Sequence, residues 1–199
     1  ARKITNMRIA ILALQGAFIE HERMMRGLGC DVFEIRKLSD WNQPKDGLII
    51  PGGESTVQSK LLNELGLSVP IRNAIISGLP VMGTCAGLIL LAEQVENGNS
   101  SMGLSTMSIE VCRNAYGRQL GSFYVKSSMK DVGEDFPMVF IRAPYIKRVY
   151  GNARVMAERD GRIVAARQEN QLVTSFHPEL TEDNRVHRYF LDMVREYGE

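Results

Sequence analysis

The fold is decided by Leu79-Pro80-Val81-Met82-Gly83-Thr84-Cys85-Ala86-Gly87-Leu88-Ile89-Leu90-Leu91, in which a turn of small residues joins two apolar runs. This pattern predicts a short strand over Pro80–Gly83, a tight turn at Cys85 and a helix over Ala86–Gln94. Gly-x-Cys-x-Gly resembles the Gly-x-Ser-x-Gly turns that carry a nucleophile. The thiol would lie just before a helix N-terminus, where the helix dipole stabilises a thiolate. A buried Cys can also be an inert packing residue, and this stretch alone does not decide between the two roles.

A second pattern near the C-terminus favours the nucleophile. Ser175-Phe176-His177-Pro178-Glu179 follows the apolar, β-rich run Gln171–Thr174. Side chains two residues apart in an extended segment point the same way. A thiol, an imidazole and a carboxylate are the groups that nucleophilic acyl transfer needs, because the thiolate attacks, the imidazole moves the proton and the carboxylate orients the imidazole. The sequence therefore predicts that Cys85, His177 and Glu179 act together.

A third pattern places a glycine pair after the apolar strand in Leu48-Ile49-Ile50-Pro51-Gly52-Gly53-Glu54-Ser55-Thr56. Glycines let backbone amides come close to a ligand. An amide of this turn and the N–H of Ala86 could together bind the oxyanion of a reacting carbonyl group. The alternative is a plain strand-to-helix turn in which Ser55 or Thr56 is the N-cap.

Strands alternate with helices through the first half of the chain, which is typical of a parallel sheet covered on both faces. Strands are expected at Arg8–Leu14, Asp31–Arg36, Gly47–Ile50 and Val81, and helices at Ala17–Leu28, Ser55–Glu64 and Val69–Ser77. From about Ser105 the pattern predicts an antiparallel or mixed extension. Its strands are expected at Met107–Val111, Ser122–Ser127, Pro137–Ile141, Arg154–Glu158, Arg162–Arg167 and Gln171–Ser175, before a last helix over Asp183–Glu196. The sequence therefore predicts an α/β fold with three layers and a mostly parallel central sheet.

Composition limits the partners. With 199 residues, of which 44% are hydrophobic, the chain is expected to form one domain over residues 1–199, with residues 1–6 as a loose extension. A net charge of +1 argues against a nucleic-acid partner. The longest uncharged apolar stretch, Leu79 to Ala92, is shorter than the roughly 18 residues that span a bilayer, so no membrane segment is predicted.

The three cysteines have neither the spacing of a zinc site nor a Cys-x-x-Cys pair. Cys30 and Cys112 are interpreted as packing residues. No metal and no disulfide are expected, and a reducing cytoplasm fits this cysteine usage best.

These motifs make the chain resemble the class I glutamine amidotransferases, and more narrowly the glutaminase subunits of pyridoxal 5′-phosphate synthase. The resemblance is carried by short blocks at Leu12–His21, Pro51–Thr56, Gly83–Gly87, Arg113–Gln119, Phe140–Pro144 and Phe176–Leu180. The Gly-Thr-Cys-Ala-Gly and His-Pro-Glu blocks are shared by amidotransferases generally, and the other blocks indicate the vitamin B6 branch. The resemblance implies the three-layer, flavodoxin-like amidotransferase fold.

The same resemblance implies the roles of the site residues. Cys85 is the nucleophile, His177 the general base and then acid, and Glu179 the group that orients the imidazole. The amides of Gly53 and Ala86 form the oxyanion hole. The L-glutamine pocket consists of Gly53, Glu54, Ser55, Arg113, Ile141 and Arg142, and an Arg suits the α-carboxylate of glutamine because its planar fork can donate two hydrogen bonds. Without the family blocks, both arginines would be interpreted as surface ion pairs.

The resemblance also implies L-glutamine as substrate, no cofactor, and a synthase subunit as partner in a large hetero-oligomer. That partner combines the ammonia with a pentose phosphate and a triose phosphate to build pyridoxal 5′-phosphate. Gln15 and Glu20 are expected docking positions. An amidotransferase of another pathway and a non-catalytic scaffolding subunit are the alternatives.

Three further residues are singled out. His21 is expected to be a hydrogen-bonded helix residue or, by the resemblance, part of a partner-facing surface. His187 is expected to be exposed on the charged C-terminal helix, and the role of Arg118 stays open.

Overall fold

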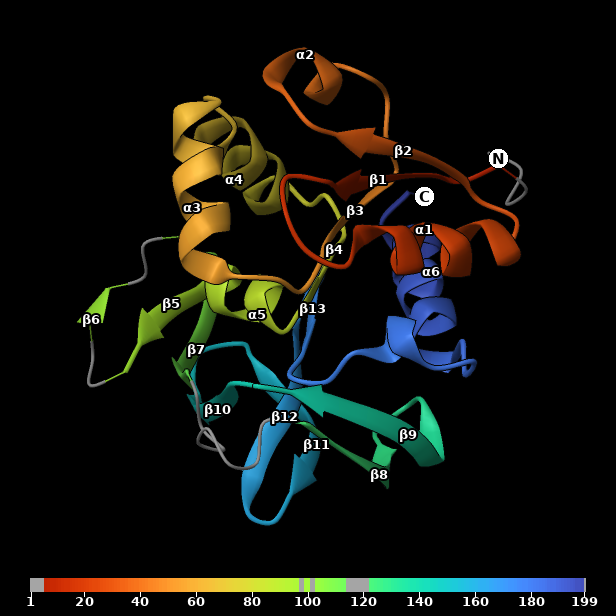
Figure 1. Ribbon diagram of the computed structural model, residues 1–199, viewed down its shortest axis with the longest axis vertical. Helices are drawn as coiled ribbons and strands as arrows, with labels where there is room; N and C mark the ends of the chain where they lie inside the picture. The colour runs from red at the N-terminus through yellow and green to blue at the C-terminus, as the bar shows by residue number, and fades with distance from the viewer. Residues whose placement is uncertain (1–5, 97–98, 101–102, 114–121, 199) are drawn as a thin grey trace.

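A twisted sheet runs through the middle of the molecule, and helices cover both of its faces (Figure 1). The computed structural model describes residues 6–96, 99–100, 103–113 and 122–198. Within these residues the sheet order is β2-β1-β3-β4-β13-β12-β10-β7-β5-β6, with β11 paired to β12. The predicted α/β fold with a mostly parallel sheet, a mixed extension and helices on both faces is confirmed.

The first five strands of this order are parallel to one another. They are β2 (Asp31–Ile35), β1 (Arg8–Leu12), β3 (Gly47–Ile50), β4 (Val81–Thr84) and β13 (Gln171–Thr174). β4 and β13 are neighbours in the sheet although almost 90 residues separate them in the chain. Their carboxyl ends therefore meet at one edge of the sheet, where ligands bind in open α/β sheets.

The remaining strands extend the sheet mainly with antiparallel pairs. They are β5 (Ala92–Val95), β6 (Asn99–Ser100), β7 (Met107–Cys112), β10 (Tyr145–Val149), β11 (Arg154–Arg159) and β12 (Arg162–Gln168). β8 (Ser122–Met129) and β9 (Gly133–Ile141) form a separate antiparallel pair that lies across one end of the molecule (Figure 1).

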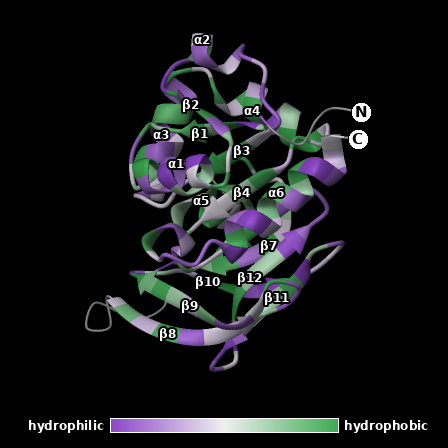
Figure 2. Ribbon diagram, turned by 90° about the vertical axis from the view of Figure 1, so that its right-hand side faces the viewer, coloured by the Kyte–Doolittle hydropathy of each residue, from purple (hydrophilic) through white to green (hydrophobic). Residues whose placement is uncertain are grey.

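Strand alternation divides the core into two sides. Ile9 and Ile11 pack into one buried cluster with Phe190, whereas Ala10 and Leu12 pack into the other. Successive side chains of a strand point to opposite faces, so a strand that is apolar throughout needs cover on both. Figure 2 shows the hydrophobic strands in the interior, with hydrophilic residues on the outer surfaces of the helices.

The helices provide this cover. α1 (Phe18–Gly27) and α6 (Arg185–Gly198) contribute residues to the first cluster, and α3 (Ser55–Glu64), α4 (Ser68–Ile76) and α5 (Ala86–Leu91) contribute to the second. Two short elements, α2 (Leu38–Trp41) and the 3-10 turn η2 (Pro178–Leu180), complete the set. None of the helices in the described ranges is long and apolar enough to cross a membrane.

One expected helix is shorter than predicted. The helix after Cys85 ends at Leu91, and Ala92–Val95 forms the strand β5 instead of its last turn. Ala92 has extended backbone angles and pairs with Met107 of β7. The preceding residues Leu88–Ala92 are apolar throughout, so periodicity does not show where the helix ends, and pairing with a distant strand decides the outcome.

Candidate active site

Cys85 lies at the corner between β4 and α5. Its backbone is left-handed, with φ 53° and ψ −101°, and its side chain is buried. Non-glycine residues adopt such angles at a cost of about 1–3 kcal/mol, and this strain is concentrated at functional sites. The backbone N–H of Cys85 donates to the Thr174 carbonyl oxygen at 2.8 Å, which ties the corner to β13. A Cβ at Gly87 would overlap the Ile50 carbonyl oxygen, so the small residue lets the helix pack directly on β3.

His177 and Glu179 follow the end of β13. Their side chains are buried, and His177 Nδ1 lies 3.1 Å from Glu179 Oε1 and 3.2 Å from Oε2. The backbone N–H of His177 donates to the Val139 carbonyl oxygen of β9 at 2.8 Å, which anchors the segment to the β8–β9 pair. The carboxylate therefore occupies one nitrogen of the imidazole and leaves Nε2 for other partners.

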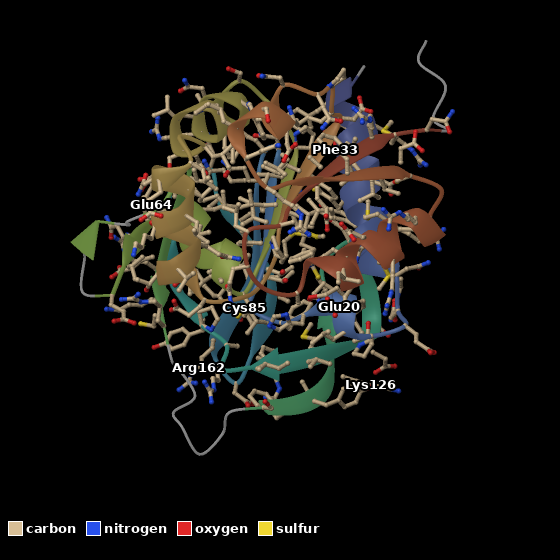
Figure 3. The ribbon with its side chains drawn as sticks, turned by 45° about the horizontal axis from the view of Figure 1, so that its top comes forward. Glu20, Phe33, Glu64, Cys85, Lys126 and Arg162 are labelled. Atoms are coloured by element: carbon tan, nitrogen blue, oxygen red, sulfur yellow. The ribbon has the colours of Figure 1, made fainter. Side chains whose placement is uncertain are left out.

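Gly52 and Gly53 follow β3, and they bring the end of that strand against Cys85 and His177. A Cβ at Gly52 would overlap His177 Cε1 and would lie 3.4 Å from Cys85 Cβ. Gln15, in the loop after β1, stabilises the backbone after this turn, because its Oε1 accepts a hydrogen bond from the Glu54 N–H at 2.7 Å. In Figure 3, Cys85 lies between α5 and β9, and its Sγ is 4.0 Å from the Ile141 carbonyl oxygen.

The helix that follows this turn is capped by Glu54. Its carboxylate accepts a hydrogen bond from the Val57 N–H at 3.0 Å. The considered N-cap at Ser55 or Thr56 is therefore wrong, because both residues already lie inside α3. This position leaves the Glu54 carboxylate at the helix N-terminus, where the helix dipole favours a negative charge.

A cavity of about 600 Å³ opens above Cys85. Expected site residues in its wall are Gly53, Glu54, Ser55, Cys85, Ala86, Arg113 and Arg142, and further wall residues are Gln15, Ile89, Glu96 and Pro144. The side chain of Ile141 is not part of this wall, although its carbonyl oxygen is near the thiol. Gln15, expected at a docking surface, therefore also belongs to the cavity.

The charges in the wall have both signs. Arg113 lies beside Glu96, which accepts its backbone N–H at 2.7 Å and whose Oε1 is 3.8 Å from the Arg113 Nε. Arg142 follows β9 with a left-handed φ of 45°. Two guanidinium groups and the Glu54 and Glu96 carboxylates can complement the carboxylate and ammonium groups of an amino acid.

The protonation of His177 depends on its two neighbours. Burial alone lowers the pKa of an imidazole, but hydrogen bonding to Cys85 and Glu179 and the charges of both raise the pKa of His177 to about 10. His177 is therefore protonated at neutral pH. Burial raises the pKa of Glu179, and the contact with His177 lowers it.

His187 is fully buried on α6, so the expectation that it is exposed is wrong. The missed signal is its spacing to Phe190, Leu191 and Val194, which places it on the apolar face of the helix. His21 is also fully buried, and its predicted hydrogen bonds are confirmed at 2.9 Å to His187 and 3.2 Å to Thr84. A place on a partner-facing surface is wrong for this side chain. Arg118 lies outside the described residues.

The packing roles expected for the other two cysteines fit their positions only in part. Cys30 is buried, and burial raises the pKa of its thiol, as expected for an unreactive packing residue. Cys112 is partly exposed at the end of β7. Among the described residues, no group of three or more His, Cys, Asp or Glu side chains could hold a metal ion.

A thiol on a strained strand-to-helix corner, an imidazole and a carboxylate at the carboxyl ends of parallel strands, and this mixed sheet are typical of the class I glutamine amidotransferases. The model of the SNO glutamine amidotransferase family matches residues 11–196. The chain therefore belongs to the SNO glutamine amidotransferase family.

Named relatives agree with this assignment. A protein of Methanocorpusculum labreanum, named pyridoxal 5′-phosphate synthase subunit PdxT, is 60% identical over 94% of this chain and 98% of its own length. A protein of Streptococcus pneumoniae with the same name is 53% identical over 96% and 98%. A solved structure, described as a crystal structure of glutamine amidotransferase, has 40% identity and a TM-score of 0.88 over 94% of this chain and 98% of that one.

Proposed function

We propose that this chain is the glutaminase subunit of a pyridoxal 5′-phosphate synthase, which hydrolyses L-glutamine to L-glutamate and ammonia. The observation that carries the proposal is the position of Cys85 on a strained corner next to the buried His177–Glu179 pair. The names of the relatives support the assignment to the vitamin B6 branch.

In the acylation half of the proposed reaction, the Cys85 thiolate attacks the side-chain amide carbon of glutamine and forms a C–S bond. The negative charge on the carbonyl oxygen is stabilised by the backbone N–H groups of Gly53 and Ala86. His177, protonated at neutral pH, donates its proton to the amide nitrogen. The C–N bond then breaks, ammonia leaves, and a glutamyl thioester remains on the enzyme.

In the deacylation half, the pKa of His177 falls because an acylated Cys85 is no longer the anion that raised it. The neutral imidazole can then take a proton from water, whose oxygen attacks the thioester carbon. The C–S bond breaks, glutamate leaves, and the thiolate and the imidazolium are restored. Glu179 keeps the imidazole oriented in both halves.

The polar ends of the substrate match the cavity wall. Arg113 and Arg142 bind the α-carboxylate, and the Glu54 and Glu96 carboxylates lie on the same wall to attract the α-ammonium group. Ser55 and the Ile141 carbonyl oxygen border the reacting end of the substrate. The cavity is of the size of small-molecule sites.

The ammonia passes to a separate synthase subunit in a large hetero-oligomer, and docking of that subunit completes the oxyanion hole. Gln15 and Glu20, on the segment that leads into α1 and on α1 itself, remain proposed docking positions. We propose a single domain over residues 1–199, a cytoplasmic location, and no nucleic-acid or membrane partner. The free thiols support a reducing compartment, and one sheet with strands from both halves of the chain supports a single domain.

The experiment that tests this function traces the side-chain amide nitrogen of glutamine into the product of the synthase. The chain and its cognate synthase subunit are given glutamine labelled with ¹⁵N in the side-chain amide, together with the pentose and triose phosphates. The proposal predicts ¹⁵N in the ring of pyridoxal 5′-phosphate. It is rejected if the synthase builds the product from ammonium salts but takes no label from glutamine in the presence of this chain. The Cys85→Ala variant is the matched control.

A further inference from the structure

The row of groups that begins at Cys85 continues beyond Glu179 to two more buried imidazoles. On the far side of that carboxylate, His21 Nε2 lies 3.4 Å from Glu179 Oε2 and 3.2 Å from Thr84 Oγ1. His21 Nδ1 in turn lies 2.9 Å from His187 Nε2. Both histidines are fully buried, and α1 and α6 bring them together from positions 166 residues apart.

Both imidazoles are neutral in the folded protein. Burial, together with the nearby His187 and His177, holds the pKa of His21 well below its usual value. Burial lowers the pKa of His187 to about 3. A neutral imidazole has one N–H donor and one lone-pair acceptor, so each ring must choose which nitrogen carries its hydrogen.

The surroundings decide this choice. The Thr84 hydroxyl can donate or accept, whereas the Glu179 carboxylate only accepts, so a hydrogen on His21 Nε2 suits both neighbours. His21 Nδ1 is then an acceptor, and His187 Nε2–H donates to it. His187 Nδ1, which carries no hydrogen in this arrangement, has no hydrogen-bond partner in the described part of the chain.

The opposite arrangement is less favourable at both ends. If His21 Nδ1–H donated to His187 Nε2, the Thr84 hydroxyl could donate to His21 Nε2, but the lone pair of that nitrogen would also lie 3.4 Å from the Glu179 carboxylate. The hydrogen of His187 would then lie on Nδ1, and a buried N–H without a partner is rarer in proteins than a buried acceptor without one. In the favoured arrangement, the N–H groups of His187 and His21 both point in the direction of Glu179.

We propose that His21 is a positioning residue for the reaction, and that His187 fixes the ring state of His21 so that an N–H always points at Glu179. This inference rests on the proposed glutaminase function. Glu179 is flanked by two imidazoles, because His177 Nδ1 is hydrogen-bonded to it on one side and His21 Nε2 lies 3.4 Å from Oε2 on the other. Both contacts stabilise the ionised carboxylate, which in turn stabilises the imidazolium form of His177.

The other charged group that acts on Glu179 is Glu20 of α1, which raises the pKa of Glu179. No other described carboxylate contributes to that shift. Loss of a donor at His21 would leave only His177 and a backbone hydrogen bond against burial and Glu20, which favour the protonated carboxylic acid. A protonated Glu179 no longer supports the imidazolium.

The first test needs no activity. The ring nitrogens of the ¹⁵N-histidine-labelled chain are observed by NMR at pH 7. We expect His21 and His187 each to be neutral with the hydrogen on Nε2. A hydrogen on Nδ1 of His21, or a doubly protonated His21, overturns the proposal.

The second test separates positioning from structure. In the complex with the synthase subunit, His21→Phe is expected to lower kcat for glutamate release by roughly 10- to 100-fold, the range for a hydrogen bond to a charged group, with KM little changed. The acidic limb of the kcat profile moves to higher pH, because Glu179 takes a proton more readily. His21→Gln, whose amide can donate to Glu179, regains most of the loss. Equal losses in both variants with an unmoved acidic limb overturn the proposal.

A third measurement distinguishes the positioning role of His21 from the proposed glutaminase function. Alkylation of Cys85 by iodoacetamide requires no glutamine, and its rate at pH 7 is expected to fall in His21→Phe and to recover in His21→Gln. An alkylation rate that is equal in the wild type and in both variants contradicts the positioning role. Absence of glutamate release in the wild type, together with the expected alkylation pattern, rejects the glutaminase function alone.

Discussion

Thr84 and Thr174 are register partners in the adjacent parallel strands β4 and β13. The nucleophile candidate Cys85 follows the first directly, and His177 follows the second by three residues. Because parallel neighbours end at the same edge of the sheet, this register brings the thiol and the imidazole together across more than 90 residues of sequence. A shift of β13 by one residue would turn its side chains to the other face and would separate the two groups.

Replacement of Cys85 by Ser is expected to lower glutamate release at least about 10³-fold, because a hydroxyl is a far weaker nucleophile than a thiolate. The protein should still fold, since the two side chains differ by one atom. Cys112→Ser, which changes a thiol outside the cavity wall, is the control and should keep its activity. Comparable rates for Cys85→Ser and the wild type would reject the nucleophile.

Gly52→Ala is expected to reduce kcat by at least about 10-fold, because the new methyl group would overlap His177 Cε1 and displace the imidazole. Gly27→Ala is the matched control. A Cβ at Gly27 meets no atom within 4 Å, and Ala is the better helix former at the end of α1. Glutamate release by both variants, and their thermal unfolding, are measured side by side. Unchanged activity of Gly52→Ala would contradict the close contact between the turn and His177.

Arg142→Lys is expected to raise KM for glutamine by roughly 10-fold, because an ammonium group cannot make the two parallel hydrogen bonds of a guanidinium. Arg142→Gln removes the charge as well and should raise KM further, by roughly 100-fold. In both variants kcat should change less than KM, since the α-carboxylate is remote from the reacting amide. Equal KM values in all three proteins would exclude Arg142 from the substrate site.

The buried His187 makes stability depend on pH with a definite sign. The pKa of His187 is about 3 in the folded protein and near 6.5 in the unfolded chain, so the unfolded chain binds one more proton between these values. The contribution of neutral His187 to the free energy of unfolding is fully present above pH 6.5. It falls by about 1.4 kcal/mol per pH unit as the pH decreases toward 3. Urea unfolding at pH 6 and pH 4 should therefore show a smaller loss for His187→Gln than for the wild type. An equal loss of unfolding free energy in the wild type and in His187→Gln would contradict the burial of a neutral His187 ring.

Local patterns predicted much of this molecule. The bounds of Gly47–Ile50 and Ser55–Glu64 follow from an apolar run and from helical periodicity, and both elements have those bounds in the structure. The corner at Cys85 follows from its small neighbours. The proximity of His177 and Glu179 follows from their spacing in an extended segment.

The remaining features depend on contacts between distant segments. The strand Ala92–Val95 forms because β7 is available to pair with it, which its own sequence, Ala-Glu-Gln-Val, does not reveal. Likewise, the contact between His21 and His187 requires α1 and α6 to cover the same face of the sheet. The spacing of His187 in its helix indicates burial, but no pattern in the sequence indicates which group it meets.

The most direct test of the account is glutamate release from glutamine by the purified chain, with and without the synthase subunit. We expect weak release by the chain alone, a marked increase when the synthase is added, and loss of both in Cys85→Ala. This result would establish a glutaminase that is activated by docking and uses Cys85. Equal turnover by the chain alone and by the complex would contradict activation by docking, and no release by a folded complex would contradict the glutaminase itself.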